Sequence, residues 1–128
     1  MEKDLEHYRK LLTAERDRLI GELKSFADPD PKMKGDWDTR FPGREPGTSD
    51  FSHSAQDEQA DAREEFETNI AQEHVLELRL AEVNRAVERL DDGSFGICRA
   101  CQQTIPEARL DANPATEYDI EHQPRSES

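Results

Sequence analysis

Apolar and aromatic residues are scarce in this sequence. Of its 128 residues, 33% are hydrophobic and only 6% are aromatic, whereas 37% are charged. A chain of this size forms one domain at most, and so little apolar surface excludes a large globular core. Two structures fit such a composition: a disordered chain, or long solvated helices that each bury one narrow stripe of side chains.

Long apolar runs and catalytic motifs are missing as well. No apolar run reaches eighteen residues and no apolar segment follows a basic start. We therefore expect neither a membrane-spanning helix nor a secretory signal, and hence a cytoplasmic protein. The sequence also has no nucleophile paired with a base and no glycine-rich phosphate loop, so we expect a protein that is not an enzyme.

Basic residues are outnumbered by acidic ones. The chain has 17 lysines and arginines against 30 aspartates and glutamates, which gives a formal net charge of -13. Such a charge repels the phosphates of DNA and RNA at long range, and this argues against direct binding to nucleic acid. It favours a protein partner with a basic surface or channel, although acidity that only keeps the protein soluble explains the same numbers.

Two segments have the apolar spacing of amphipathic helices. In residues 1–26 apolar side chains recur three, four or seven positions apart, and in residues 55–92 they form a coiled-coil-like seam that stops at Gly93. The first stripe contains Leu5, Tyr8, Leu12, Leu19, Leu23 and Phe26, and the second contains Phe66, Ile70, Leu76, Leu80, Val83, Val87 and Leu90. Facing stripes of this kind predict a mostly α-helical fold built on an antiparallel helical hairpin. We expect a monomer, although the same seams can also pair between two chains.

The segments outside these helices have a different composition. Residues 27–54 contain four of the seven prolines and three of the six glycines, and they show no sustained period. Proline cannot continue a helix, and loops of such length in compact domains are usually functional or disordered. The sequence therefore predicts a long, partly flexible loop here and a disordered tail at residues 124–128.

The two cysteines lie close together in a short segment, residues 93–123. Cys98 and Cys101 have the Cys-x-x-Cys spacing that supplies half of a tetrahedral zinc site. Asp119 and His122 form a second pair of donors further along the chain. A zinc-finger-like knuckle with these four ligands is one prediction, and two free thiols beside a solvated tail are the alternative. Without a metal the knuckle depends on its own apolar side chains, which are Phe95, Ile97, Ile105, Leu110, Tyr118 and Ile120.

Short sequence elements follow one another around the cysteine pair. They are an acidic-glycine turn, an aromatic residue, Gly-x-Cys-x-x-Cys, Ile-Pro, Arg-Leu and Ala-x-Pro. In this sequence they stand at Asp92-Gly93, Phe95, Gly96, Cys98, Cys101, Ile105-Pro106, Arg109-Leu110, Ala112 and Pro114. The series resembles the zinc-finger region of the DksA/TraR family of bacterial RNA polymerase regulators, in particular its stress-protein branch with a short first helix. The likeness continues back to about Glu58, and Asp119 stands where complete fingers of the family have a third cysteine.

The resemblance implies a function in transcription without catalysis. In DksA-like proteins a helical hairpin enters the secondary channel of RNA polymerase, acidic residues at its tip approach the catalytic magnesium, and the zinc end stays at the rim. Such proteins change the lifetime of promoter complexes and can respond to the alarmone ppGpp. The family's tip motif, Asp-x-x-Asp-x-Ala, falls on residues 55–60, with Ala55 in place of the first aspartate. The tip residues that the resemblance implies for partner binding are Asp57, Glu58, Ala60 and Asp61.

Two other functions remain open on the sequence. The chain is a general stress or protein-interaction factor if its finger docks on another protein and its hairpin never enters the polymerase. It is a thiol switch if Cys98 and Cys101 oxidise to a disulfide. Arg99 between them favours the thiolate that such chemistry needs, whereas the acidic surroundings oppose it.

Overall fold

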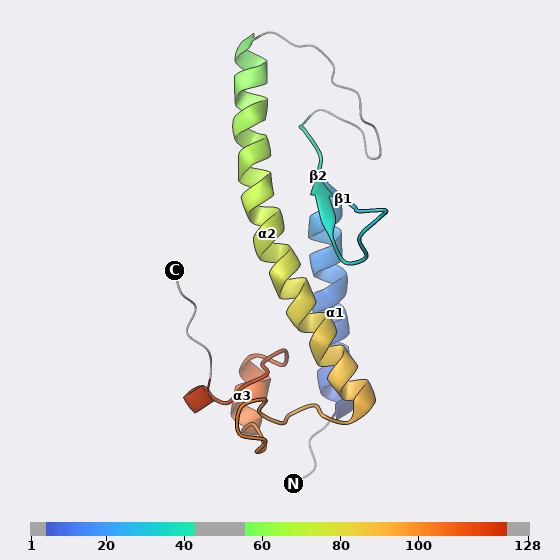
Figure 1. Ribbon diagram of the computed structural model, residues 1–128, viewed down its shortest axis with the longest axis vertical. Helices are drawn as coiled ribbons and strands as arrows, with labels where there is room; N and C mark the ends of the chain where they lie inside the picture. The colour runs from blue at the N-terminus through green and yellow to red at the C-terminus, as the bar shows by residue number, and fades with distance from the viewer. Residues whose placement is uncertain (1–4, 43–55, 123–128) are drawn as a thin grey trace. The chain divides into compact units, whose positions relative to one another are not determined.

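The computed structural model describes residues 5–42 and 56–122, except for the side chains of residues 56–59 and of His122. Its helices are α1 (Leu5–Lys24), α2 (Gln56–Asp92), the short α3 (Glu107–Ala112) and a 3-10 turn, η1 (Ile120–His122). Its strands are β1 (Ala27–Pro29) and β2 (Trp37–Thr39) (Figure 1). The predicted mostly α-helical fold is confirmed. None of the helices in the described ranges is long and apolar enough to cross a membrane.

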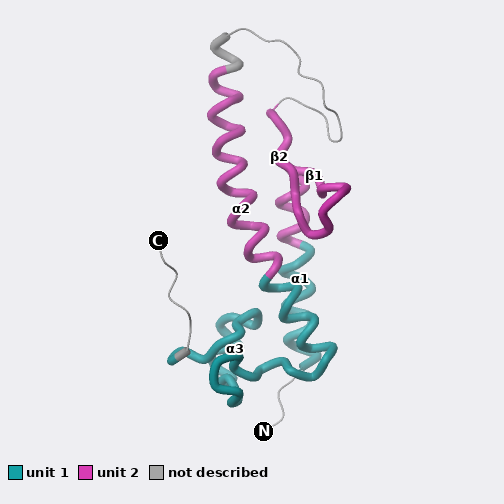
Figure 2. The backbone as a smooth tube through the Cα atoms, in the orientation of Figure 1, with its two compact units in different colours: residues 1–17, 82–128 teal, residues 18–81 magenta. Residues whose placement is uncertain are grey.

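The chain divides into two compact units (Figure 2). Unit 1 consists of Met1–Asp17 and Glu82–Ser128, and unit 2 consists of Arg18–Ala81. Both long helices contribute to both units, because the division falls within α1 and within α2. Each unit therefore contains a part of each long helix and one smaller structure, which is the cysteine knuckle in unit 1 and a β-hairpin in unit 2.

In unit 1 the start of α1 and the end of α2 run antiparallel. Arg9 Nη2 forms an ion pair with Asp91 Oδ1 at 2.9 Å, and the Tyr8 ring centroid lies 5.5 Å from that of Phe95, just beyond α2. The apolar side chains buried in this unit are Tyr8, Leu12, Val83, Ala86, Leu90, Phe95, Ile105, Leu110 and Ala115. Burying one leucine or valine in such a core contributes roughly 2 kcal/mol. The antiparallel pairing that the apolar stripes predict is present in this unit.

The end of α2 follows the sequence prediction of a stop at Gly93. The amides of Gly93, Ser94 and Phe95 all donate to the carbonyl oxygen of Arg89, at 3.0 to 3.2 Å. Gly93 has a φ of +87°, a left-handed conformation that glycine adopts without strain. Hydrogen bonds from the hydroxyl and amide of Ser94 to Asp92 Oδ1 lower the pKa of the Asp92 carboxyl. The helix thus ends in a hydrogen-bonded turn that leads directly into the knuckle.

Part of the predicted loop, residues 27–54, is an ordered β-hairpin in unit 2. Strands β1 and β2 pair antiparallel, with Ala27 opposite Thr39 and Pro29 opposite Trp37. Ala27 is fully buried and Trp37 is half-buried, so one face of the hairpin packs on the helices of this unit. The loop prediction is corrected for the residues of these two strands. Residues 43–54 lie outside the part of the chain that the structure describes.

The turn of this hairpin is closed by a side chain. Asp30 Oδ1 accepts hydrogen bonds from the amides of Lys32 at 2.8 Å and Met33 at 3.3 Å, which is an Asx turn. Gly35 follows with a φ of +92°. Pro31 and Gly35, two of the residues on which the loop prediction rests, therefore lie in the turn between two very short strands.

Arg40 connects the hairpin to the end of α1. Its guanidinium donates to the carbonyl oxygens of Ala27 at 2.7 Å and Lys24 at 2.8 Å, and it forms an ion pair with Asp28 at 2.9 Å. The last carbonyl groups of a helix have no partner within the helix, so the contact with Lys24 caps α1. The hairpin is thereby a continuation of α1 and not a free loop.

The hairpin also reaches α2. The ring centroids of Phe41 and Phe66 are 5.3 Å apart, a distance typical of favourable aromatic pairs. Phe66 and Leu76 of the predicted seam are half-buried and Leu80 is buried, but Ile70 is 43% exposed. The prediction that Ile70 belongs to the buried seam is therefore wrong.

Tyr8 generates the first prediction. Its side chain is 1% exposed, and its hydroxyl donates to Asp111 Oδ1 of the α3 segment at 2.7 Å. Tyr8→Phe keeps the ring and removes this bond, which should lower the free energy of unfolding by about 1 kcal/mol in urea denaturation. The matched control is Tyr118→Phe, at the only other tyrosine. Equal stability of Tyr8→Phe and the unmodified protein would show that the bond does not hold α3.

Candidate metal centre

The knuckle in unit 1 places the two cysteines on a tight backbone turn. The amide of Gln102 donates to the Cys98 carbonyl at 2.9 Å, and the Cys98 amide donates to the carbonyl of Gln103 at 2.8 Å. Gln102 has a φ of +63°, so the turn includes a left-handed residue. The chain then returns along itself, with Ile97 and Thr104 forming an isolated β-bridge. This local geometry directs both thiols to the same side of the turn.

Three donor atoms converge on this side. The sulfur atoms of Cys98 and Cys101 and a carboxylate oxygen of Asp119 all lie within 4.8 Å of one another. Cys98 is fully buried, whereas Cys101 and Asp119 are half-buried. The structure thus brings together three of the four residues that the sequence proposes as ligands.

His122 is the fourth proposed ligand. It is the last residue of η1, which begins directly after Asp119, so its backbone lies in the knuckle. The position of its side chain lies outside the described part of the structure. Its role as a ligand stays a prediction.

The three converging residues fit a zinc ion by their chemistry and spacing. Thiolate sulfur at about 2.3 Å and carboxylate oxygen at about 2.1 Å around tetrahedral zinc leave these donors about 3.5 Å apart. The sulfur of Cys101 lies 3.4 Å from Asp119 Oδ2. Such a set leaves one position of a tetrahedron for a further donor.

The two thiols have different environments. Burial raises the pKa of the Cys98 thiol, but backbone hydrogen bonds, the largest of them from Asp119, outweigh it and bring this pKa below its usual value. A backbone hydrogen bond from Gln103 lowers the pKa of Cys101, but burial and the hydrogen bonds to Cys98 and Asp119 raise it overall. The raised pKa favours the protonated thiol of Cys101, whose proton a metal ion replaces on binding.

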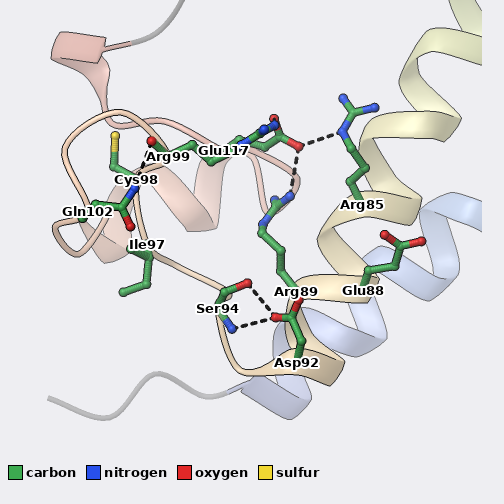
Figure 3. A pocket seen from close by; sticks show the side chains of 10 residues that line it. All are labelled: Arg85, Glu88, Arg89, Asp92, Ser94, Ile97, Cys98, Arg99, Gln102 and Glu117. Atoms are coloured by element: carbon green, nitrogen blue, oxygen red, sulfur yellow. Dashed lines mark hydrogen bonds and ion pairs between the residues drawn. The ribbon is translucent and has the colours of Figure 1, made fainter.

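A cluster of charges joins the knuckle to α2. Glu117 accepts from Arg85 Nε at 2.7 Å, from Arg89 Nη1 at 3.0 Å and from Arg99 Nη1 at 2.9 Å. We call these four residues the Glu117 cluster. They line a pocket of about 340 Å³, which Figure 3 shows beside Cys98. The side chains of Glu117 and Arg89 are only 10% and 11% exposed, so this pair is largely removed from water.

The electrostatics of the cluster follow from that burial. Desolvation raises the pKa of Glu117, but the hydrogen bonds of Arg85 and Arg99 and the charges of the arginines outweigh it and hold this pKa below its usual value. Desolvation also lowers the pKa of Arg89, against the attraction of Glu117. The cluster is not among the sites predicted from the sequence. The one signal in the sequence is the pair Arg85 and Arg89, two like charges one helical turn apart that need an anion between them.

The proposed tip residues belong to unit 2. Asp57 and Glu58 stand in the first turn of α2, and their side chains lie outside the described part. Ala60 and Asp61 follow on the same helix and are exposed. The structure therefore places this group at the start of α2, whereas the cysteine knuckle follows the end of that helix.

Comparisons with known proteins agree with this geometry. The sequence profile of the prokaryotic dksA/traR C4-type zinc finger matches residues 93–118, the segment that contains both cysteines and Glu117. The fold is similar to the solved structure of transcription factor DksA2 from Pseudomonas aeruginosa, with a TM-score of 0.64 over 91% of this chain and 78% of that one. The resemblance to the DksA/TraR family is confirmed. At 20% identity the likeness to DksA2 shows the fold alone.

Curated relatives match shorter stretches of this DksA/TraR-like chain. An uncharacterized protein of Aquifex aeolicus is 40% identical over 55 residues, which is 43% of this chain and 37% of that protein. General stress protein 16O of Bacillus subtilis is 43% identical over 44 residues, which is 34% of this chain and 27% of that protein. The matches thus span roughly a third of each relative's length.

The Glu117 cluster generates the second prediction. Glu117→Gln removes the anion that compensates Arg89, and it should lower the free energy of unfolding by about 2 kcal/mol, because one member of a buried ion pair is left without its partner. The difference should be full above the ordinary glutamate pKa of 4.5 and should shrink as the pH falls through the lowered pKa of Glu117.

Urea denaturation at several pH values measures this effect. The matched control is Glu88→Gln, which changes an exposed carboxylate that lines the same pocket. A Glu117→Gln variant as stable as the control near neutral pH would contradict the assignment.

Proposed function

We propose that this protein is a non-enzymatic regulator of transcription in the cytoplasm that binds RNA polymerase. In this proposal an acidic helical hairpin enters the secondary channel and the Cys98 knuckle acts as a structural clamp. The observation that supports it most is the combination of a DksA-like fold with a DksA/TraR-type finger in the same chain. The proposal includes ppGpp as an effector, because the family resemblance implies it. It also includes a monomeric state.

The charge of the chain supports a channel with basic walls as the site of binding. A net charge of -13 favours approach to a positive surface and disfavours approach to nucleic acid. The proposed tip adds to this effect, because Asp57, Glu58 and Asp61 are acidic residues in the first two turns of a helix. At that position carboxylates also stabilise the helix dipole, so the tip combines a folding role with the proposed recognition role.

The clamp in this proposal is a zinc ion held by Cys98, Cys101 and Asp119, with His122 as the fourth ligand. When bound, zinc would supply a structural cross-link between the cysteine turn and the segment before η1. The positions of Cys101 and Asp119 support this role, because the Asp119 carboxylate hydrogen-bonds to the Cys101 thiol and the segment around Glu117 is held by three arginines.

Metal content is the third prediction. Purified protein should contain about one equivalent of zinc by elemental mass spectrometry. Cys98→Ser should lose it, and Asp119→Ala and His122→Ala should each weaken zinc binding about tenfold or more in a chelator competition. Asp119→Cys should strengthen binding, because zinc prefers a thiolate to a carboxylate.

The control for this series is Glu121→Ala, which changes an exposed carboxylate between the two proposed ligands. Unchanged affinity in His122→Ala would remove His122 from the ligand set. Less than half an equivalent of zinc, together with a readily formed disulfide between Cys98 and Cys101, would favour the thiol switch over the clamp.

Polymerase binding is the fourth prediction. The protein should be retained by immobilised core RNA polymerase at low salt and less so at high salt, because exposed charges are screened by ions. The double variant Asp57→Ala, Glu58→Ala should lose most of its effect on the lifetime of promoter complexes. The matched control is Glu64→Ala, Glu65→Ala, which removes the same charge from exposed positions further along α2.

The result separates two functions. No retention at low salt would favour a protein-interaction factor that acts outside the polymerase. If the protein is retained and both double variants change the lifetime of promoter complexes equally, RNA polymerase remains the partner. The tip residues then have no part in the mechanism.

A further inference from the structure

Two carboxylic side chains meet beneath the hairpin of unit 2. Glu73 of α2 is only 8% exposed, although glutamate is rarely buried without a partner. Its Oε1 atom is buried and has no hydrogen-bond partner in the described part of the chain. A buried oxygen without a partner is unfavourable, because it has lost its water without gaining a compensating hydrogen bond.

Glu77 lies one helical turn further on and is half-buried. Its side chain is hydrogen-bonded to that of Glu73, and it also accepts a hydrogen bond from the backbone amide of Trp37 in β2. A hydrogen bond between two carboxyl groups requires a proton on one of them. Such a bond therefore needs a proton on Glu77 or Glu73, and the bond to the Trp37 amide connects α2 to the hairpin.

The charges around the pair are of the same sign. Asp36, at the start of the returning arm of the hairpin, acts on Glu77, and Asp38 of β2 interacts with Glu73. Asp38 in turn is affected by Asp28 and Asp30. On α2 itself the neighbouring side chain of His74 is exposed. Loss of the proton would thus place two carboxylates of α2 against a hairpin that is itself acidic.

Burial and the hydrogen bond to Glu73 are the largest causes that raise the pKa of Glu77, and they bring it to about 7 from 4.5. The folded unit then binds more protons than the unfolded chain between these two values. The stabilisation by this proton is fully present below pH 4.5 and is lost as the pH rises through about 7.

We propose that the Glu73–Glu77 pair is a proton-dependent latch that holds the β1–β2 hairpin on α2. With one proton shared, Glu77 binds Glu73 and the Trp37 amide, and the hairpin is docked. When Glu77 releases that proton to solvent, the repulsion between the two carboxylates and Asp36 weakens docking and moves Trp37 into water. The latch is independent of polymerase binding and of the metal centre, which lies in unit 1.

Trp37 makes the test direct, because it is the only tryptophan of the chain. We would record its fluorescence from about pH 5 to about pH 9, a range that brackets the raised glutamate pKa. The emission maximum should move to longer wavelength with a midpoint near 7. Glu77→Gln keeps the shape and both hydrogen bonds without a titrating proton, so its emission should stay at the short-wavelength value throughout.

Three further variants make the result specific. Glu67→Gln changes an exposed carboxylate of α2 in the same unit and should retain the transition. His74→Gln should retain it as well. Glu73→Gln removes the repelling neighbour, so the midpoint should fall towards 4.5. Far-ultraviolet circular dichroism confirms that each variant keeps its helices.

A second measurement does not depend on any variant. Exchange of the Trp37 amide hydrogen, corrected for the intrinsic effect of pH, should accelerate across the same transition. The proposal is overturned if the folded protein shows no Trp37 transition, if Glu77→Gln retains it, or if His74→Gln abolishes it.

Discussion

The contact of Glu117 with three arginines decides how the knuckle is held in unit 1. Arg85 and Arg89 project from α2 one turn apart and repel each other, and Glu117 supplies the anion that makes their proximity favourable. The chain has too few apolar residues to orient a short segment by burial alone. Directional ion pairs and the Tyr8 hydrogen bond to Asp111 provide that orientation instead.

The surroundings of a partly buried glutamate shift its pKa in opposite directions in the two units. In unit 1 Glu117 is compensated by arginines, and its pKa is lowered. In unit 2 Glu77 faces other carboxylates, and its pKa is raised to about 7. The Glu117 carboxylate of unit 1 therefore stays ionised near neutrality, whereas the raised pKa of Glu77 in unit 2 falls in that range. With 30 acidic and 17 basic residues, the chain cannot pair every carboxylate with a cation. In the proposed latch, a proton on Glu77 removes a negative charge that no cation compensates.

Local patterns of the sequence predict local structure well here. The spacing of apolar residues predicts both long helices, Gly93 predicts the end of α2, and the spacing of Cys98 and Cys101 predicts the turn that brings their thiols together. Features that depend on contacts between residues far apart in the sequence are not predicted by such local patterns. The β-hairpin has strands of three residues, too short for a period, and the Glu117 cluster joins positions that are 18 to 32 residues apart. Ile120 looks like a core residue but is 74% exposed, because the backbone enters η1 there.

The same distant contacts explain how an aspartate can stand at the position of a third cysteine. The carbonyl oxygen of Tyr118 accepts hydrogen bonds from Arg109 Nε at 2.8 Å and from the hydroxyl of Thr116 at 2.9 Å, and Glu117 is held by its arginines. The backbone that leads to Asp119 is therefore fixed by protein contacts before any metal contributes. A carboxylate is a weaker zinc donor than a thiolate, but a donor already held in position loses less conformational entropy on binding. In the proposed metal-bound form, the ion pairs of Glu117 and the metal ligands would therefore stabilise the same loop.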